Sequence, residues 1–249
     1  MSHDVTVAYL HRPQVGHNFA DSLLRMWIWD SQHDSRFTKV MTLGAPSNGP
    51  ATARNSVVQE FLTTSDQWLL WLDDDMGFAP DTLNRLMAAA DPTDRPIVGA
   101  LCFALRELGP DGLGGFHCMA KPTLYEWTDQ GGGVRKFAST SEYPPDTVVP
   151  VAATGSACIL IHRSVFESIM DQYESDPPKG KLYDPIRGSD GDLLGEDISF
   201  CVRAAGLGYP IHVHTGVPTN HMKSIWVGEP MFEAETTLTR TLQKMEVPV

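Results

Sequence analysis

Three consecutive aspartates, Asp73, Asp74 and Asp75, directly follow the apolar run WLLWL at residues 68–72. Three like charges in a row repel one another, so positive charge or water must stand beside them. Carboxylates at the end of a buried strand can hold a hard divalent cation such as Mg²⁺ or Mn²⁺, together with substrate phosphates. The alternative is that one aspartate caps the following helix and the others are solvated.

Strand geometry makes the metal interpretation specific. Successive side chains of a strand point to opposite faces, and the chain rises about 3.3 Å per residue. If the strand continues, Asp73 and Asp75 share one face and Asp74 points to the other. Open α/β sheets bind ligands at the carboxyl ends of their strands, which is where this run stands. The pattern predicts a cation held by Asp73 and Asp75.

Two distant segments carry further reactive side chains. Arg54, in TARN, stands early in an expected helix, where its guanidinium could meet a diphosphate or a neighbouring carboxylate, or simply face solvent. Glu196 and Asp197, in GED, stand at the start of another expected helix. A carboxylate there could be a general base that accepts a proton from an attacking hydroxyl. Favourable placement near the helix dipole is the other explanation.

The segment HVHTGVPTNHM contributes His212, His214 and His221. His212 and His214 share one face of an expected strand, because they are two residues apart. A single histidine is more often structural than a metal ligand, and imidazole is nevertheless a common ligand of divalent metals. The clustering favours a ligand among the three and leaves open which one it is.

Alternating strands and helices would position these side chains. Strands are expected at residues 4–10, 36–44, 67–72 and 95–103, and helices at 18–30, 49–64 and 79–90. Residues 106–147, rich in glycine and proline, are expected to form short strands and loops. Further along we expect a strand–turn–strand–helix run at 147–170, a polar loop at 175–195, a helix at 196–208 and a strand at 209–215. The alternation predicts an α/β fold with a mainly parallel central sheet and helices on both faces.

Composition narrows the class of protein. The 249 residues are 42% hydrophobic and carry a net charge of −12, which disfavours nonspecific binding to nucleic acid or anionic lipid. The four cysteines are scattered, so neither a zinc knuckle nor a disulfide framework is indicated. The N-terminus lacks the features of a signal peptide, and no apolar run is long enough to span a membrane. We expect a soluble, cytoplasmic protein with free thiols.

Taken in chain order, the motifs resemble those of GT-A fold glycosyltransferases, closest to the family 2 type and its phage and bacterial relatives. The similar segments are TARN, LLWLDDDM, TGSACILIHRSVFESI and GEDISFCVRAAGLGYPIHVHTGVPTNH, and the resemblance covers residues 4–222. It implies a single GT-A domain over residues 1–249, with a nucleotide-sugar-binding half at 1–104 and an acceptor and catalytic half at 105–249. It also implies transfer of a hexose from a UDP- or GDP-sugar to a hydroxyl of an unidentified acceptor, with inversion. The cofactor would be Mn²⁺ or Mg²⁺, and the location the host cytoplasm if the chain is phage-encoded.

The resemblance also implies roles for individual residues. The metal ligands would be Asp73, Asp75 and His221, with Asp75 in direct contact. The donor would be bound by Arg54, Asn55, Asp73, Asp74, Gly155 and Ser156. Asp197 would be the catalytic base, and Glu196 would orient the acceptor or take that role itself. His214 stands where relatives often carry an acidic residue, which keeps the choice of histidine open.

Two other functions remain compatible with the sequence. A GT-A-like module could bind a sugar or nucleotide without turnover, and it would differ from the enzyme only in whether Asp197 acts as a base. A phosphatase of the haloacid-dehalogenase type also carries a DxD motif after a buried strand. That family places Thr or Val two residues after the second aspartate, where this chain has Gly77, so the phosphatase ranks below the transferase.

Overall fold

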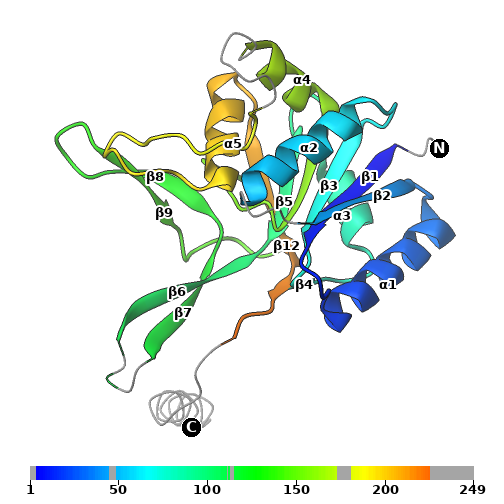
Figure 1. Ribbon diagram of the computed structural model, residues 1–249, viewed down its shortest axis with the longest axis horizontal. Coiled ribbons are helices and arrows are strands. Elements are labelled where there is room, and N and C mark those ends of the chain that lie inside the picture. The colour runs from blue at the N-terminus through cyan, green and yellow to red at the C-terminus, as the bar shows by residue number, and fades with distance from the viewer. Residues whose placement is uncertain (1–3, 45–48, 111, 113–114, 173–180, 225–249) are drawn as a thin grey trace, which may run out of the picture. The chain divides into compact units, whose positions relative to one another are not determined.

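A seven-stranded sheet organises the fold of the computed structural model, which describes residues 4–44, 49–110, 112, 115–172 and 181–224. The strand order is β10-β12-β5-β11-β3-β1-β2, and Figure 1 labels β12, β5, β3, β1 and β2 of these strands. Its strands are β1 (Val5–His11), β2 (Phe37–Gly44), β3 (Trp68–Asp73), β5 (Ile97–Leu101), β10 (Val148–Val151), β11 (Cys158–His162) and β12 (Ile211–Pro218). β1 pairs in parallel with β2 and β3, and β12 with β5, whereas β11 and β10 run antiparallel to their neighbours. The predicted mainly parallel sheet is confirmed.

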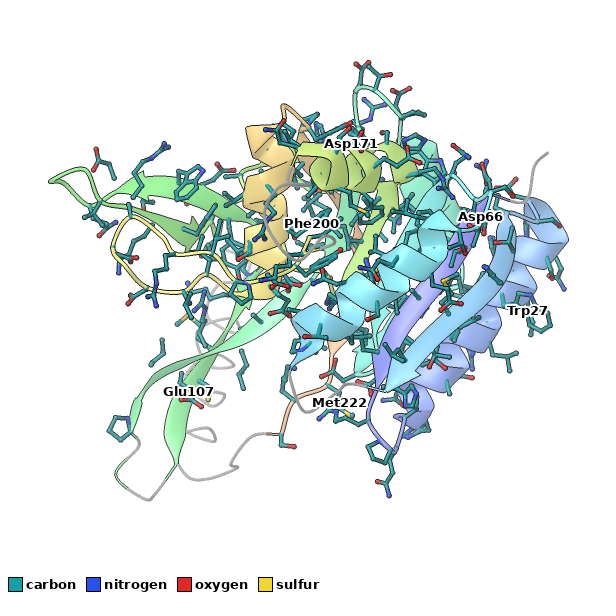
Figure 2. All side chains as sticks on the ribbon, turned by 45° about the horizontal axis from the view of Figure 1, so that its top comes forward. Trp27, Asp66, Glu107, Asp171, Phe200 and Met222 are labelled. Atoms are coloured by element: carbon teal, nitrogen blue, oxygen red, sulfur yellow. The ribbon has the colours of Figure 1, made fainter. Side chains whose placement is uncertain are left out.

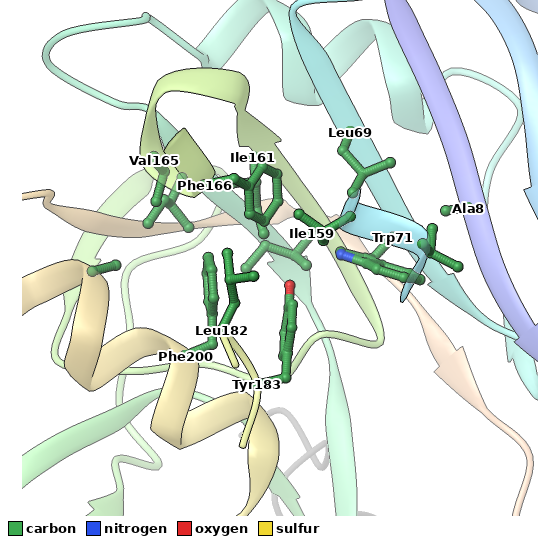
Figure 3. Close-up of a cluster of buried hydrophobic side chains, with 14 of the residues drawn as sticks. Ala8, Leu69, Trp71, Ile159, Ile161, Val165, Phe166, Leu182, Tyr183 and Phe200 are labelled. Carbon is green, nitrogen blue, oxygen red and sulfur yellow. The ribbon is translucent and has the colours of Figure 1, made fainter. Parts of the chain in front are cut away.

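Helices cover both faces of the sheet, as the sequence predicts. They are α1 (His17–His33), α2 (Pro50–Leu62), α3 (Thr82–Ala89), α4 (Arg163–Gln172) and α5 (Glu196–Gly206). α2, α4 and α5 bury Phe61, Phe166 and Phe200 against one face, while α1 and α3 bury Phe19 and Leu83 against the other. Figure 3 shows part of the first of these two cores.

β3 is buried on both faces, which explains why its apolar run does not alternate with polar residues. Leu69 and Trp71 join the core under α2, whereas Leu70 and Leu72 join the core under α1. Because successive side chains alternate between the faces, Asp73, the last residue of β3, lies on the α2 side.

Three two-stranded ribbons complete the secondary structure of the described residues. β4 (Met76–Gly77) pairs antiparallel with β13 (Asn220–His221), β6 (Phe103–Pro110) pairs with β7 (Phe116–Pro122), and β8 (Tyr125–Asp129) pairs with β9 (Arg135–Ser139). The expected strand at 95–103 is therefore two strands, and the expected strand at 209–215 continues to Pro218. Residues 175–180 of the expected polar loop lie outside the described residues.

The chain divides into two compact units. Met1–Ala104 and Lys121–Met222 form the first, and Leu105–Ala120 and Lys223–Val249 form the second. Every candidate site residue belongs to the first unit, which takes in sequence from both expected halves, so the single-domain organisation stays a prediction. In the described part of the chain, no helix is long and apolar enough to cross a membrane.

Candidate active site

The end of β3 meets a buried arginine. Pro50 starts α2 after Gly49, whose φ of 91° favours glycine, and Arg54 follows in the next turn. Its Nη2 lies 2.8 Å from Oδ1 of Asp73, and the arginine side chain is only 3% exposed. Its guanidinium carbon lies 4.8 Å from the centroid of the Trp71 ring, a cation–π distance. The sequence allowed three partners for Arg54, and the structure pairs it with a neighbouring carboxylate.

Asp197 reaches the same arginine from α5. Glu196 and Asp197 occupy the first turn of that helix, where negative charge is also favoured by the helix dipole. Oδ1 of Asp197 lies 3.9 Å from Nε of Arg54. The hydroxyl and the backbone amide of Ser156 act on this carboxylate and lower its pKa, but among the described residues no group donates a hydrogen bond to Oδ1. A Cβ at Gly155 would sit 3.7 Å from Oδ2, so the glycine leaves that side of the carboxylate open.

Burial and charge set the proton affinity of this cluster. Burial raises the pKa of the Asp197 carboxyl, and repulsion by Asp73 adds to the rise, while Arg54 and Ser156 act against it. The pKa of Glu196 is also raised, first by burial and then by repulsion from Asp197. Burial alone would lower the pKa of Arg54, yet Asp73 and Asp197 together raise it above its ordinary value. A carboxylate with a raised pKa is a stronger proton acceptor.

The other two aspartates, Asp74 and Asp75, contact a different arginine. Nη2 of Arg12 lies 3.6 Å from Oδ1 of Asp74 and 3.6 Å from Oδ2 of Asp75. The backbone amide of Arg12 also donates to Oδ2 of Asp74 at 3.0 Å. The expected continuation of the strand is wrong, because pairing with β1 ends at Leu10–Asp73 and the chain then turns. Asp73 therefore contacts Arg54, whereas Asp74 and Asp75 both contact Arg12.

His221 lies beside the other carboxylate oxygen of Asp75, Oδ1. Its Nε2 lies 3.1 Å from Oδ1 of Asp75, and its Nδ1 lies 2.9 Å from the carbonyl oxygen of Phe103. A carbonyl can only accept, so Nδ1 carries a proton and Nε2 faces the carboxylate with a lone pair or a second proton. Two lone pairs at this distance need a proton or a cation between them. Because imidazole and carboxylate are both ligands of divalent transition metals, Asp75 and His221 fit Mn²⁺.

The structure brings together part of the predicted metal set. Asp75 and His221 are paired, but Asp73 is engaged by Arg54. Over residues 4–224, within the ranges described, no group of three or more His, Cys, Asp or Glu side chains is arranged to hold a metal ion. Of the three histidines, His221 is the one paired with an aspartate of the run. His214 lies in β12, where its Nδ1 accepts a hydrogen bond from the Gly216 amide at 3.2 Å. The three-ligand assignment stays a prediction.

Asn55, predicted to bind the donor, is 8% exposed and uses its amide within the protein. Its Nδ2 donates to Oδ1 of Asp184 at 2.7 Å, and its Oδ1 accepts from the Tyr183 amide at 2.9 Å. Asn55 thereby fixes the segment that carries Tyr183, whose ring lies 5.8 Å from the guanidinium of Arg54 and stacks on Phe200 at 4.8 Å (Figure 3).

The sequence assigned no role to two contributors to the site. Tyr183 lies in a polar, proline-flanked segment without periodicity, so nothing in the sequence indicated that it is fully buried. Arg12 follows β1, and the one available signal was a basic residue at the carboxyl end of a strand beside the expected metal site.

Two pockets adjoin Asp75. One, of about 650 Å³, is lined by residues 12–17, Asp74, Asp75 and Met222. The other, of about 600 Å³, lies between the start of α1 and the β4–β13 ribbon and also includes Asp75, His221 and Met222. Met222, labelled in Figure 2, thus borders both pockets. Volumes of this size suit small-molecule ligands.

No protein-family model and no curated protein matches the chain. Solved structures do. A197 from STIV is similar with a TM-score of 0.52 and 14% identity, covering 89% of this chain and 86% of that one. GalNAc-T7, solved with UDP, GalNAc and Mn²⁺, is similar with a TM-score of 0.54 and 11% identity. The similarity covers 89% of this chain and 44% of the GalNAc-T7 chain. At these identities the likeness shows the fold alone, and the predicted GT-A fold is confirmed.

Proposed function

We propose that the chain is a cation-dependent glycosyltransferase of the family 2 type that moves a hexose from a UDP- or GDP-sugar to an acceptor hydroxyl, with inversion. One observation carries this proposal: Arg54 contacts both Asp73, at the tip of β3, and Asp197, at the start of α5. A candidate base is thereby held beside the aspartate run at the edge of the sheet where such folds bind ligands. The GT-A fold supports the proposal, since GalNAc-T7 was solved with UDP, GalNAc and Mn²⁺.

Asp197 is the proposed base. The acceptor hydroxyl would pass its proton to Oδ2, on the side of the carboxylate that Gly155 leaves open, because Oδ1 is buried and faces Nε of Arg54. The hydroxyl oxygen would bond to the anomeric carbon of the donor, and the bond from that carbon to the diphosphate would break, its electron pair leaving with the diphosphate. Ser156 and Arg54 orient the carboxylate, so it loses little freedom when the acceptor binds. Glu196 then has the supporting role of orienting the acceptor.

Arg54 would keep this base usable. Burial favours the protonated form of Asp197, and the nearby guanidinium acts against it, so that the carboxylate can still accept a proton. The same guanidinium fixes Asp73, which with Gly155 would border the donor sugar. Because Arg54 is buried and lies over Trp71, the geometry is held by the protein core rather than by a surface loop.

Asp75 and His221 would hold the cation, whose charge would offset the negative charge that builds up on the departing diphosphate. The carbonyl of Phe103 fixes the ring orientation of His221. Asp74, anchored by the Arg12 amide, would face the ribose or sugar of the donor.

Donor hydrolysis tests the proposal without knowledge of the acceptor. UDP- and GDP-sugars are incubated with the protein and Mn²⁺, and release of nucleoside diphosphate is measured. We expect slow release that stops on chelation and in Asp75→Ala, but continues in Asp171→Ala, which removes an exposed carboxylate of α4. Release that persists without metal would contradict the proposal. Nucleotide binding with no release from any donor would favour the non-catalytic module instead.

A further inference from the structure

Arg12 supplies positive charge at the place where the cation is expected. Its Nη2 lies 3.6 Å from Asp75 Oδ2 and 3.6 Å from Asp74 Oδ1, while His221 faces the other oxygen of Asp75. The guanidinium and a divalent cation held by Asp75 would therefore be close neighbours of like charge, and their repulsion disfavours occupancy of the site by both. Arg12 and the cation thus compete for the same carboxylate.

Arg12 is able to leave this position. Its side chain is 68% exposed, so the guanidinium returns to water when the contacts break. Asp74 and Asp75 are 11% exposed, and they keep the Arg12 amide and His221, respectively, as partners. The backbone amide of Arg12 stays on Asp74, which keeps the start of the side chain in place while its head moves. The side chain also borders the pocket of about 650 Å³ next to Asp74 and Asp75.

A guanidinium that leaves a carboxylate needs another anion, and a diphosphate is well matched to its planar donor geometry. We propose that Arg12 couples cation binding to donor binding: it neutralises Asp74 and Asp75 when the site holds neither ligand, and it transfers to the donor diphosphate when the cation occupies Asp75. This inference rests on the proposed function. It assigns a positioning role to Arg12, in addition to the roles proposed for the aspartates, Arg54 and His221.

The test is a pair of affinities with opposite expected changes. Mn²⁺ binding without nucleotide is measured by electron paramagnetic resonance, and UDP and GDP binding in saturating Mn²⁺ by calorimetry. Arg12→Ala should bind Mn²⁺ about threefold to tenfold more tightly, because the guanidinium no longer competes for Asp74 and Asp75. It should bind whichever nucleotide the parent protein prefers on the order of tenfold more weakly, because the charge-assisted contacts to the diphosphate are lost. Arg12→Lys should lie between Arg12→Ala and the parent protein in both measurements.

Arg25→Ala is the matched control, since Arg25 is 65% exposed and is paired with Asp21 at 2.8 Å on α1. Both of its affinities should equal those of the parent protein. A structural defect in Arg12→Ala would weaken both ligands, so only opposite changes support the inference. Unchanged or weaker Mn²⁺ binding, or unchanged nucleotide binding, overturns the coupling and leaves the proposed function standing. A parent protein that binds neither nucleotide in Mn²⁺ overturns the proposed function and the inference together.

Discussion

The aspartate run contacts two arginines that differ in burial, one on each side. On one side Asp73 contacts Arg54, which is 3% exposed, lies over Trp71 and also approaches Asp197. On the other side Asp74 and Asp75 contact Arg12, which is 68% exposed. The residue types are the same, and the chain between the two sides is one turn at the end of β3.

This difference separates a fixed contact from an exchangeable one. Breaking the Arg54 contacts leaves a guanidinium that is 3% exposed away from water, whereas breaking the Arg12 contacts returns a guanidinium that is 68% exposed to water. Asp74 and Asp75 are only 11% exposed, but they keep the Arg12 amide and His221, respectively, as partners. The Arg54 side therefore suits a base that must keep its orientation through every cycle. The Arg12 side suits a place where ligands arrive and leave.

The largest expected effect tests whether the chemistry belongs to the buried side. Asp197→Asn keeps the shape of the side chain but cannot act as a base, so sugar transfer should fall about 10²- to 10⁴-fold. UDP or GDP binding in Mn²⁺, measured by calorimetry, should not change, because Arg12, Asp75 and His221 are intact. Transfer at the parent rate would show that Asp197 is not the base. The Arg54 side would then have no catalytic role to set against ligand binding on the Arg12 side.

Arg54→Ala should produce the next largest effect, on stability. It leaves Asp73 and Asp197 next to each other without their shared cation, and loss of one partner of a buried pair costs about 3–5 kcal/mol. Both carboxylates are partly exposed, 31% and 28%, so we expect the low end, about 3 kcal/mol, in urea unfolding. Arg54→Met, which keeps most of the packing on Trp71, should remain clearly destabilised. A loss under about 1 kcal/mol in both variants would make the two sides energetically alike.

Much of the fold could be predicted from the sequence because its signals are local. The unbroken apolar run of β3 indicated a strand buried on both faces, and the alternation of strands and helices indicated the parallel sheet. The GED motif at the start of α5 and the histidines in and after β12 were likewise visible as candidates.

The pairing of charges could not be predicted, because it depends on where β3 loses its neighbour. The sequence suggested that Asp73 and Asp75 act together, but the turn after Asp73 sends them to different arginines. Contacts between segments far apart in the chain, such as Asn55 with Tyr183 and Asp184, leave no periodic signal at all.

On the Arg54 side, the ionisation of Asp197 should make the free energy of unfolding depend on pH, with an effect smaller than that of Arg54→Ala. Burial, with repulsion from Asp73, raises the pKa of Asp197 in the folded protein, against the attraction of Arg54. A raised folded pKa favours the protonated form, so the contribution of this group to stability is full below the unfolded pKa and is lost as pH rises through the folded pKa. Asp197→Asn should therefore be more stable than the parent protein at pH 7, by less than the Arg54→Ala loss. That advantage should disappear in unfolding measured below the unfolded pKa. Transfer by the parent protein should fall as pH drops through the folded pKa, because the base becomes protonated.

The smallest expected effect is the stability of Arg12→Ala, and it completes the comparison. Because the side chain is mostly exposed, its removal should change the free energy of unfolding by less than about 1 kcal/mol. The change should shrink further in 1 M NaCl, where screening acts over about 3 Å, while the Arg54→Ala loss should persist because salt screens buried pairs much less. A loss in Arg12→Ala as large as that in Arg54→Ala, at either salt concentration, would mean that Arg12 is a structural residue. If the fold depends on the contacts of Arg12 with the aspartates, Arg12 cannot leave them for a ligand. A large loss of stability would therefore also contradict the coupling proposed for Arg12.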